Sequence, residues 1–194
     1  MKALNTYYNG YLFRSRLEAR WAVFFDSCGV SWEYESQGYE LKNGLWYLPD
    51  FLLHDVWFNH AGYGKYGKHD LYVEVKGFMS KDDANKIRAF AEEKPILLVE
   101  DIPNAETMIG LCECMSEAET VYGITPYNFE TVDGDWFGAY PGVDLDGTFT
   151  LFGDDSTYLD SCDEKFTVNA YRKARCARFE QGDIVVEKLK KGVI

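Results

Sequence analysis

The chain has 194 residues and a net charge of −12, and 46% of its residues are hydrophobic and 16% aromatic. This apolar content excludes wholesale disorder, and the negative charge excludes a general, charge-driven affinity for nucleic acid. The N-terminal MKALNTYYNG lacks the apolar run of a signal peptide, and no stretch reaches the length of a membrane span, so we expect a cytoplasmic protein with no membrane partner.

The first predicted element is a helix over residues 15–29. Apolar side chains recur there at helical spacing, with Ser15 as the N-cap and Gly29 after the last turn. On this helical period Arg14 falls inside the apolar arc and Glu18 lies at its edge, so the two charges should be paired or functional. Ser15 and Glu18 also fit a capping box, in which Glu18 would only reach back to the Ser15 amide. The two roles of Glu18 are not exclusive.

Strands and a second helix follow along the chain. Alternating, aromatic-rich sequence predicts the strands, and a Gly- and His-rich excursion at 54–70 separates the second strand from the third. The order becomes helix, strand, strand, strand, helix, strand. The predicted elements are strands at 31–41, 45–53 and 71–76, a helix at 80–94 and a buried apolar strand at 95–100.

Two short motifs place charged residues on these strands. Pro49 and Asp50 interrupt an otherwise apolar strand, and the missing amide proton of Pro49 suits a point where a strand opens. In LYVEVKG, Glu74 and Lys76 share one face because alternate side chains of a strand do, while the valines between them point into a core. The motif is either an exposed ion pair or a carboxylate for a metal ion with an ammonium beside it.

In this order, the helix with Glu18 and the strands with Asp50 and with Glu74-Val75-Lys76 resemble the PD-(D/E)XK nuclease superfamily, the restriction-endonuclease-like enzymes. The segments FRSRLEARW, YLPDF, EVKG and ARCARFE are similar to small phage-encoded members. The resemblance covers about residues 10–100 and 167–182. The excursion at 54–70 is long for this family, and the acidic residues 100–164 match no feature of it.

The fold implied by the resemblance is mixed α/β (α+β). A restriction-endonuclease-like nuclease core would occupy residues 1–100, an acidic β-rich elaboration residues 101–164, and a basic C-terminal helix and tail, packed on the core, residues 165–194. The elaboration belongs either to the same domain or to a small subdomain. Turn signals between aromatic-rich pieces predict antiparallel strands over 121–160.

The resemblance also implies Mg²⁺-dependent hydrolysis of DNA phosphodiesters by a phage-type endonuclease in DNA processing or recombination, inside an infected bacterial host. Asp50, Glu74 and the Val75 carbonyl would hold Mg²⁺, a hard ion that prefers oxygen ligands, and Mn²⁺ is expected to substitute. Glu18 would hold a water at the metal or a second ion. Lys76 would orient or deprotonate the attacking water, or stabilise charge on the phosphate.

Contacts to DNA are expected from the basic ends of the chain. A helix predicted over 167–180 places Tyr171, Arg175 and Arg178 within one arc, which suits phosphate contacts and base stacking. A solvated charged face that only keeps the helix soluble is the equal alternative. The candidate DNA-binding residues are Arg14, Arg16, Arg20, Tyr171, Arg175 and Arg178.

The acidic segment supports a second hypothesis. Residues 100–164 contain sixteen Asp or Glu and no Lys or Arg. Such a segment could bind a basic protein partner or imitate the DNA backbone, which would make the chain a catalytically inactive, nuclease-fold protein of DNA-mimic or anti-defence type. A plain solubility-promoting surface is a third interpretation. A dimer is compatible with cutting two strands, but no sequence feature indicates one.

Overall fold

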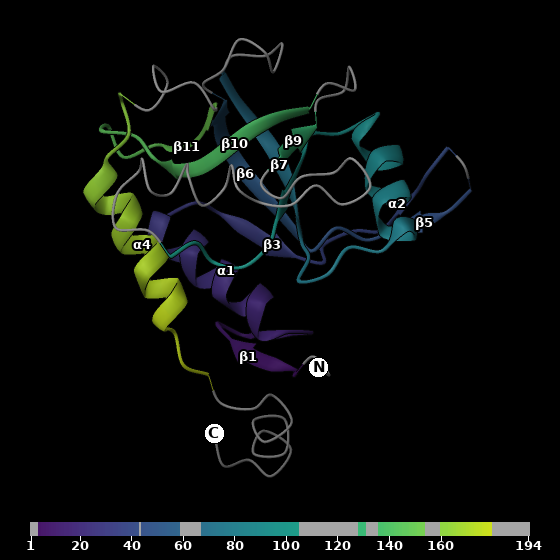
Figure 1. Ribbon diagram of the computed structural model, residues 1–194, viewed down its shortest axis with the longest axis horizontal. Coiled ribbons are helices and arrows are strands. Elements are labelled where there is room, and N and C mark those ends of the chain that lie inside the picture. Colours follow the sequence, from purple (N-terminus) through teal and green to yellow (C-terminus); the bar gives the residue numbers. More distant parts are fainter. Residues whose placement is uncertain are drawn as a thin grey trace.

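A curled mixed sheet of seven strands forms the centre of the computed structural model (Figure 1). The structure describes residues 4–42, 44–58, 67–104, 128–130, 136–153 and 160–179. The strand order is β11-β10-β9-β8-β7-β6-β3, and β11 also pairs in parallel with the far end of β6, so the sheet curls back on itself. The sheet strands are β3 (Trp32–Tyr34), β6 (Phe51–Phe58), β7 (Gly67–Val75), β8 (Ile96–Val99), β9 (Asn128–Glu130), β10 (Trp136–Val143) and β11 (Phe149–Gly153).

Two hairpins and three helices complete the described part of the chain. The hairpins and helices are β1 (Thr6–Tyr8) with β2 (Tyr11–Phe13), β4 (Tyr39–Glu40) with β5 (Trp46–Tyr47), α1 (Arg16–Cys28), α2 (Lys81–Ala91) and α4 (Glu164–Cys176). The mixed α/β class predicted from the sequence is therefore confirmed. None of the described helices has the length and apolarity that crossing a membrane requires.

The sheet has a hydrophobic core on each face. Helices α1 and α4 pack side by side against one face, as Figure 1 shows, and the other face is covered by α2 and the β4–β5 hairpin. Strand β7 divides its side chains between the two cores. Val73 and Val75 join the α1 core, as their alternation predicts, whereas Tyr72 joins the α2 core.

Helix α1 forms where the apolar spacing predicts it. Ser15 is the N-cap and accepts a hydrogen bond from the Glu18 amide, and Gly29 ends the helix in the left-handed conformation, with φ of 73°. Trp21 is fully buried, and its indole N–H donates to the Glu100 carbonyl at 2.7 Å, which ties the helix to the end of β8. This contact helps hold α1 beside the start of β6 and the end of β7, where the charged motifs lie.

The strand predictions were right in place but wrong in length. The predicted strand at 31–41 divides into β3 and β4, and that at 45–53 divides into β5 and β6, with Pro49 and Asp50 between them. Much of the predicted excursion at 54–70 is strand, because β6 runs to Phe58 and β7 begins at Gly67. A bulge at His54 and Asp55 adds one residue to β6, and Asp55 takes a positive φ of 55°.

The remaining elements match the predictions in part. Helix α2 has Ser80 as its N-cap in a capping box with Asp83, and β8 is a buried strand, as expected. The antiparallel strands predicted within 121–160 are present as β9, β10 and β11. Helix α4 begins at Glu164, earlier than predicted, and ends at Cys176, so Arg178 lies beyond it. Residues 105–120, where the sequence is also compatible with a helix, lie outside the described residues.

Candidate active site

The two strand motifs bring Asp50 and Glu74 together. Strands β6 and β7 are antiparallel, with Phe51 opposite Val73, and one further step along this register puts Asp50 opposite Glu74. Directly opposed side chains lie on the same face and close together. Both carboxylates are buried, with only 2% of each residue exposed, so Glu74 and Lys76 are not the exposed ion pair of the simpler interpretation.

Asp50 is held at both oxygens. Its Oδ1 accepts from the Arg14 guanidinium at 2.6 Å, and its Oδ2 accepts from the Val75 amide at 2.8 Å. Burial, with the nearby Glu74 and Glu18 carboxylates, raises the pKa of Asp50 to about 8, although Val75 and Arg14 act in the opposite direction. The site therefore holds more negative charge than its own cations neutralise.

Glu74 is anchored by a tyrosine and by Lys76. Its Oε2 accepts from the Tyr47 hydroxyl and its Oε1 contacts the Lys76 ammonium, each at 2.7 Å. Burial lowers the pKa of Lys76, but Glu74, Asp50 and Asp83 outweigh that effect and raise it above the ordinary value. Lys76 is consequently a stable cation at neutral pH, which favours a role in charge stabilisation over one as a proton acceptor.

Glu18 combines a capping role with a place beside the carboxylate pair. Its Oε1 accepts from the Ser15 hydroxyl at 2.7 Å, and its Oε2 accepts from the Tyr34 hydroxyl at 2.5 Å and the Arg14 amide at 3.1 Å. Glu18 was expected to accept a hydrogen bond from the Ser15 amide, but it accepts one from the Arg14 amide instead. Only 7% of Glu18 is exposed, and its charge acts on Asp50.

The prediction for Arg14 needs correction. Arg14 precedes α1, so the helical period does not place it on the apolar face, and 57% of its side chain is exposed. Its guanidinium does not pair with Glu18; it bridges Asp50 and Glu35, with Nε 2.8 Å from the Glu35 carboxylate. Arg14 still belongs to the site, as the cation that faces Asp50.

Three of these residues, Arg14, Glu74 and Lys76, line a pocket of about 200 Å³, and Asp50 lies behind them, in contact with Arg14. The pocket joins the ends of three elements, namely the β4–β5 hairpin, β7 and α2. Its lining residues are Arg14, Trp46, Tyr47, Leu48, Glu74, Lys76, Asp83 and Lys86.

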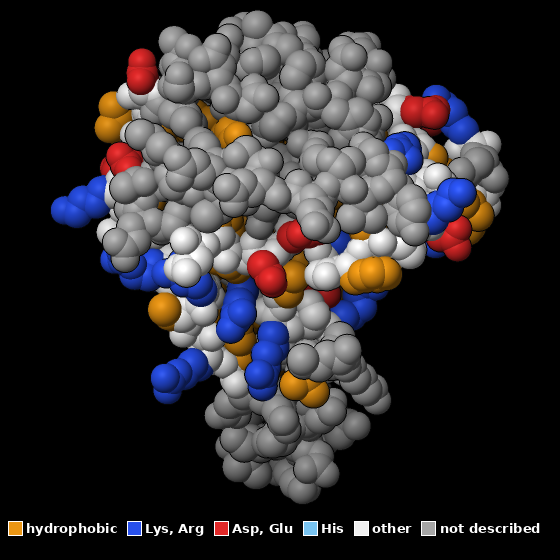
Figure 2. Space-filling model, in the orientation of Figure 1, with side chains coloured by type: hydrophobic (Ala, Val, Ile, Leu, Met, Phe, Trp, Pro, Cys, Tyr) orange, Lys and Arg blue, Asp and Glu red, His pale blue; other side chains and the backbone are white. Residues whose placement is uncertain are grey.

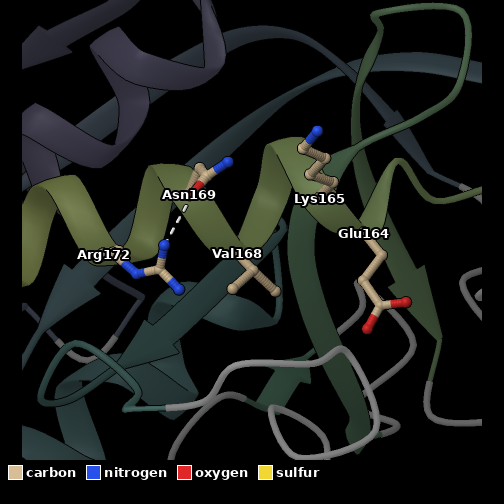
Figure 3. Close-up of a pocket in the computed structure, with 5 residues that line it drawn as sticks. All are labelled: Glu164, Lys165, Val168, Asn169 and Arg172. Atoms are coloured by element: carbon tan, nitrogen blue, oxygen red, sulfur yellow. Dashed lines mark hydrogen bonds between the residues drawn. The ribbon is translucent and has the colours of Figure 1, made fainter.

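A larger hollow of about 430 Å³ lies along α4 and has a different chemistry. Glu164, Val168 and Arg172 project from one side of the helix there, and Arg172 donates to Asn169 at 3.2 Å (Figure 3). Among the described residues that line it, Glu164 is the one carboxylate, and none is a buried acid. The pocket beside Glu74 is therefore the better candidate for chemistry.

The residues beside the pocket are suited to a hard cation, although the described residues contain no group of three or more His, Cys, Asp or Glu side chains placed to hold a metal. Asp50 and Glu74 offer oxygens that each retain a lone pair beside their present hydrogen bond. The Val75 N–H donates to Asp50, and the Lys76 N–H donates to the Val99 carbonyl on the opposite side of the backbone. In an extended strand the carbonyl of a residue points away from the next residue's N–H, so the Val75 carbonyl points to the Asp50 side. Two carboxylates, one carbonyl and waters would satisfy Mg²⁺.

The expected DNA-binding residues do not form one stripe. Figure 2 shows Lys and Arg side chains gathered over α4 and α1. Arg16 and Arg178 are exposed, whereas Arg20 is half-buried, with an Nε that has no hydrogen-bond partner among the described residues. Arg175 donates to the Pro103 carbonyl at 3.0 Å, so it joins α4 to the segment after β8.

Tyr171 does not fit the expected role. The residue is fully buried, its ring stacks on Phe24 with centroids 4.1 Å apart, and its hydroxyl donates to the Pro141 carbonyl at 2.7 Å. A buried ring offers no face to a base, so the prediction of an exposed aromatic on this helix is wrong. Tyr171 instead fixes α4 against α1 and β10.

We expect Tyr171→Phe to lower the free energy of unfolding by about 1 kcal/mol, because the Pro141 carbonyl loses its buried donor. Chemical denaturation would measure this loss. The affinity for any nucleic acid should stay unchanged. A weaker affinity at unchanged stability would restore Tyr171 to the binding surface.

Several residues of the site have no signal of their function in the sequence. Tyr34 and Tyr47 donate to the two glutamates, Glu35 pairs with Arg14, and Asp83 lies 3.6 Å from Lys76. The capping pattern Ser80-x-x-Asp83 could have drawn attention to Asp83. The other three reach the site only through strand pairing, which no local pattern reveals.

Searches of protein-family models, curated proteins and solved structures each found no match to this chain. The resemblance to PD-(D/E)XK enzymes therefore stays a prediction from the sequence.

Proposed function

We propose that the chain is a metal-dependent nuclease of the PD-(D/E)XK kind, with a restriction-endonuclease-like core, that hydrolyses phosphodiester bonds in DNA. The observation that carries the proposal is the buried pair Asp50 and Glu74 on adjacent strands, with Lys76 on Glu74, beside a pocket. The order α1, β3, β6, β7, α2, β8 also supports it, since each motif lies on or beside the element that the resemblance requires.

The chain's own residues divide the work by their positions. Asp50, Glu74 and the Val75 carbonyl would hold Mg²⁺, with Glu18 beside them, and Mn²⁺ should replace it. The ion would supply Lewis acidity toward the phosphate. Lys76 stabilises charge on the scissile phosphate, and Arg14 can exchange its contact with Asp50 for one with a phosphate oxygen because its side chain is largely exposed. In the overall reaction water adds to phosphorus, one ester bond breaks, and the leaving oxygen takes up a proton.

The proposal is tested by incubating the protein with plasmid, linear duplex, single-stranded and four-way-junction DNA in Mg²⁺, Mn²⁺ or EDTA. Cleavage of at least one substrate that requires the metal is the expected result. Failure to cleave any of them, with the fold intact by circular dichroism, would overturn the proposal.

Lys76→Ala should lower the rate of cleavage about 10²–10³-fold, because the phosphate loses the cation that stabilises its transition state. Metal binding should persist, since Asp50 and Glu74 remain. Lys68→Ala is the matched control, because Lys68 is an exposed lysine near the start of β7, whereas Lys76 directly follows the end of that strand. Single-turnover rates measure the effect, and equal rates for the two variants would remove Lys76 from the mechanism.

The protein partner predicted for residues 100–164 stays a prediction. Most of that segment lies outside the described residues. Among the described acids, Asp101 is exposed, and Asp146 lies in the exposed turn between β10 and β11. A partner of basic character would be the outcome to pursue if no substrate is cleaved.

A further inference from the structure

The mouth of the candidate active site carries exposed apolar side chains that the proposed chemistry does not use. Trp46 and Leu48 line the pocket beside Glu74 and are 67% and 38% exposed. Phe78 follows Lys76 by two residues and is 82% exposed. Single exposed apolar residues are ordinary on protein surfaces, but Trp46 and Leu48 line one polar pocket, and Phe78 is close in the chain to Lys76 of the same pocket.

The fold holds Trp46 outward without needing it for the core. In the β4–β5 hairpin the next residue, Tyr47, turns inward, is 7% exposed and packs in the α2 core. Trp46 packs close over Gly38, because a Cβ added to that glycine would lie 3.8 Å from the ring. The backbone thus supports one part of a large ring that is otherwise mostly open to solvent.

The charges of the pocket are too few to hold a nucleic acid by phosphate contacts alone. Arg14 is paired with Asp50 and Glu35, and Lys76 with Glu74. Among the lining residues, Lys86 is the one cation without an ion pair in the described part of the chain. With one such cation at the pocket, stacking has to supply much of the affinity there.

We propose that Trp46, together with Phe78, is a stacking platform for unpaired bases, so that the substrate is a single-stranded nucleic acid. This inference rests on the proposed nuclease function. A base within a duplex has both faces covered by its neighbours, whereas an unpaired base can stack on an aromatic ring. A base stacked on Trp46 would lie beside the pocket that Glu74, Lys76 and Lys86 line.

The test measures binding in EDTA, where cleavage is prevented, with a 20-nucleotide strand that contains 2-aminopurine. The same strand annealed to its complement serves as the duplex for comparison. An RNA strand of the same sequence tests whether the protein prefers single-stranded DNA or single-stranded RNA. We expect tighter binding of a single strand than of the duplex, with quenching of the 2-aminopurine fluorescence. Trp46→Ala and Phe78→Ala should each weaken single-strand binding about 5- to 100-fold.

Two controls distinguish stacking from a general loss of surface. Trp46→Phe keeps a ring and should retain most of the affinity and the quenching. Phe166→Ala removes an aromatic that is 44% exposed on α4, a helix that packs against the other face of the sheet, and should change nothing. Equal affinity for single strand and duplex, or unchanged binding by Trp46→Ala, overturns the inference.

Cleavage in Mg²⁺ is measured separately, so the two proposals can fail independently. Trp46-dependent binding of a single strand without cleavage of any substrate would keep the platform and overturn the nuclease. Metal-dependent cleavage that prefers duplex and ignores Trp46→Ala would keep the nuclease and overturn the platform.

Discussion

Asp50→Asn should abolish metal-dependent cleavage, with a loss of at least about 10³-fold, and should at the same time stabilise the fold. The loss follows because a neutral amide is a poor ligand for Mg²⁺ and leaves Glu74 as the remaining carboxylate of the pair. The gain follows because Asp50 is buried against Glu74 and Glu18, and a neutral side chain of the same shape removes that repulsion. The amide can accept from only one of the two present donors, Arg14 and the Val75 amide, and this lost hydrogen bond offsets part of the gain.

The sign of the stability effect depends on pH. The folded pKa of Asp50, about 8, lies above its ordinary value of 3.8, so between these values the unfolded chain is ionised while the folded one keeps its proton. The wild-type free energy of unfolding therefore falls as pH rises from about 4 to about 8. The free energy of unfolding of the Asp50→Asn variant lacks the decrease that Asp50 causes. At pH 8 the variant should be more stable by about 1–3 kcal/mol.

Urea denaturation at pH 5, 7 and 8 measures the stability, and single-turnover cleavage measures the activity. Asp70→Asn is the matched control, because Asp70 is an exposed carboxylate on β7 that contacts His54 away from the pocket. It should keep full activity. Retained cleavage in Asp50→Asn would remove Asp50 from the site, and a destabilised variant would contradict the account of its burial.

Local patterns predicted the part of the site that lies within single elements. Strand alternation placed Glu74 and Lys76 on one face and Val73 and Val75 in the core, and both placements hold. The cap of α1 was equally local, since Ser15 is followed at once by the apolar period. These predictions need only the geometry of one strand or one helix.

The errors came from tertiary packing. Tyr171 is three residues before Ala174, so the two share a helix face, and that face packs against α1. The helical period placed Tyr171 in one arc with Arg175 and Arg178, but the sequence contained no information on where α1 would pack. Tyr47 likewise reaches Glu74 only because β4 and β5 form a hairpin over β7.

The apparent affinity for Mg²⁺ should rise about tenfold per pH unit between pH 6 and pH 8 and then level off. A carboxylate has to lose its proton before it can bind a metal, and burial beside Glu74 and Glu18 keeps the Asp50 proton in place up to about pH 8. Below that pH the metal competes with this proton, so the total change from pH 6 to the plateau above pH 8 is about 100-fold.

Isothermal titration with Mg²⁺ at pH 6, 7, 8 and 9 measures this effect without any substrate, and the heat measured in buffers of different ionisation enthalpy reports the released proton. Wild-type protein should release about one proton per ion at pH 6–7 and almost none at pH 9. Asp70→Asn should behave as wild type, whereas Asp50→Asn should lose the pH dependence together with most of the affinity. An affinity that is constant from pH 6 to pH 8 would show that no proton has to leave Asp50 when Mg²⁺ binds. The buried pair of Asp50 and Glu74 would then need another explanation than a metal site.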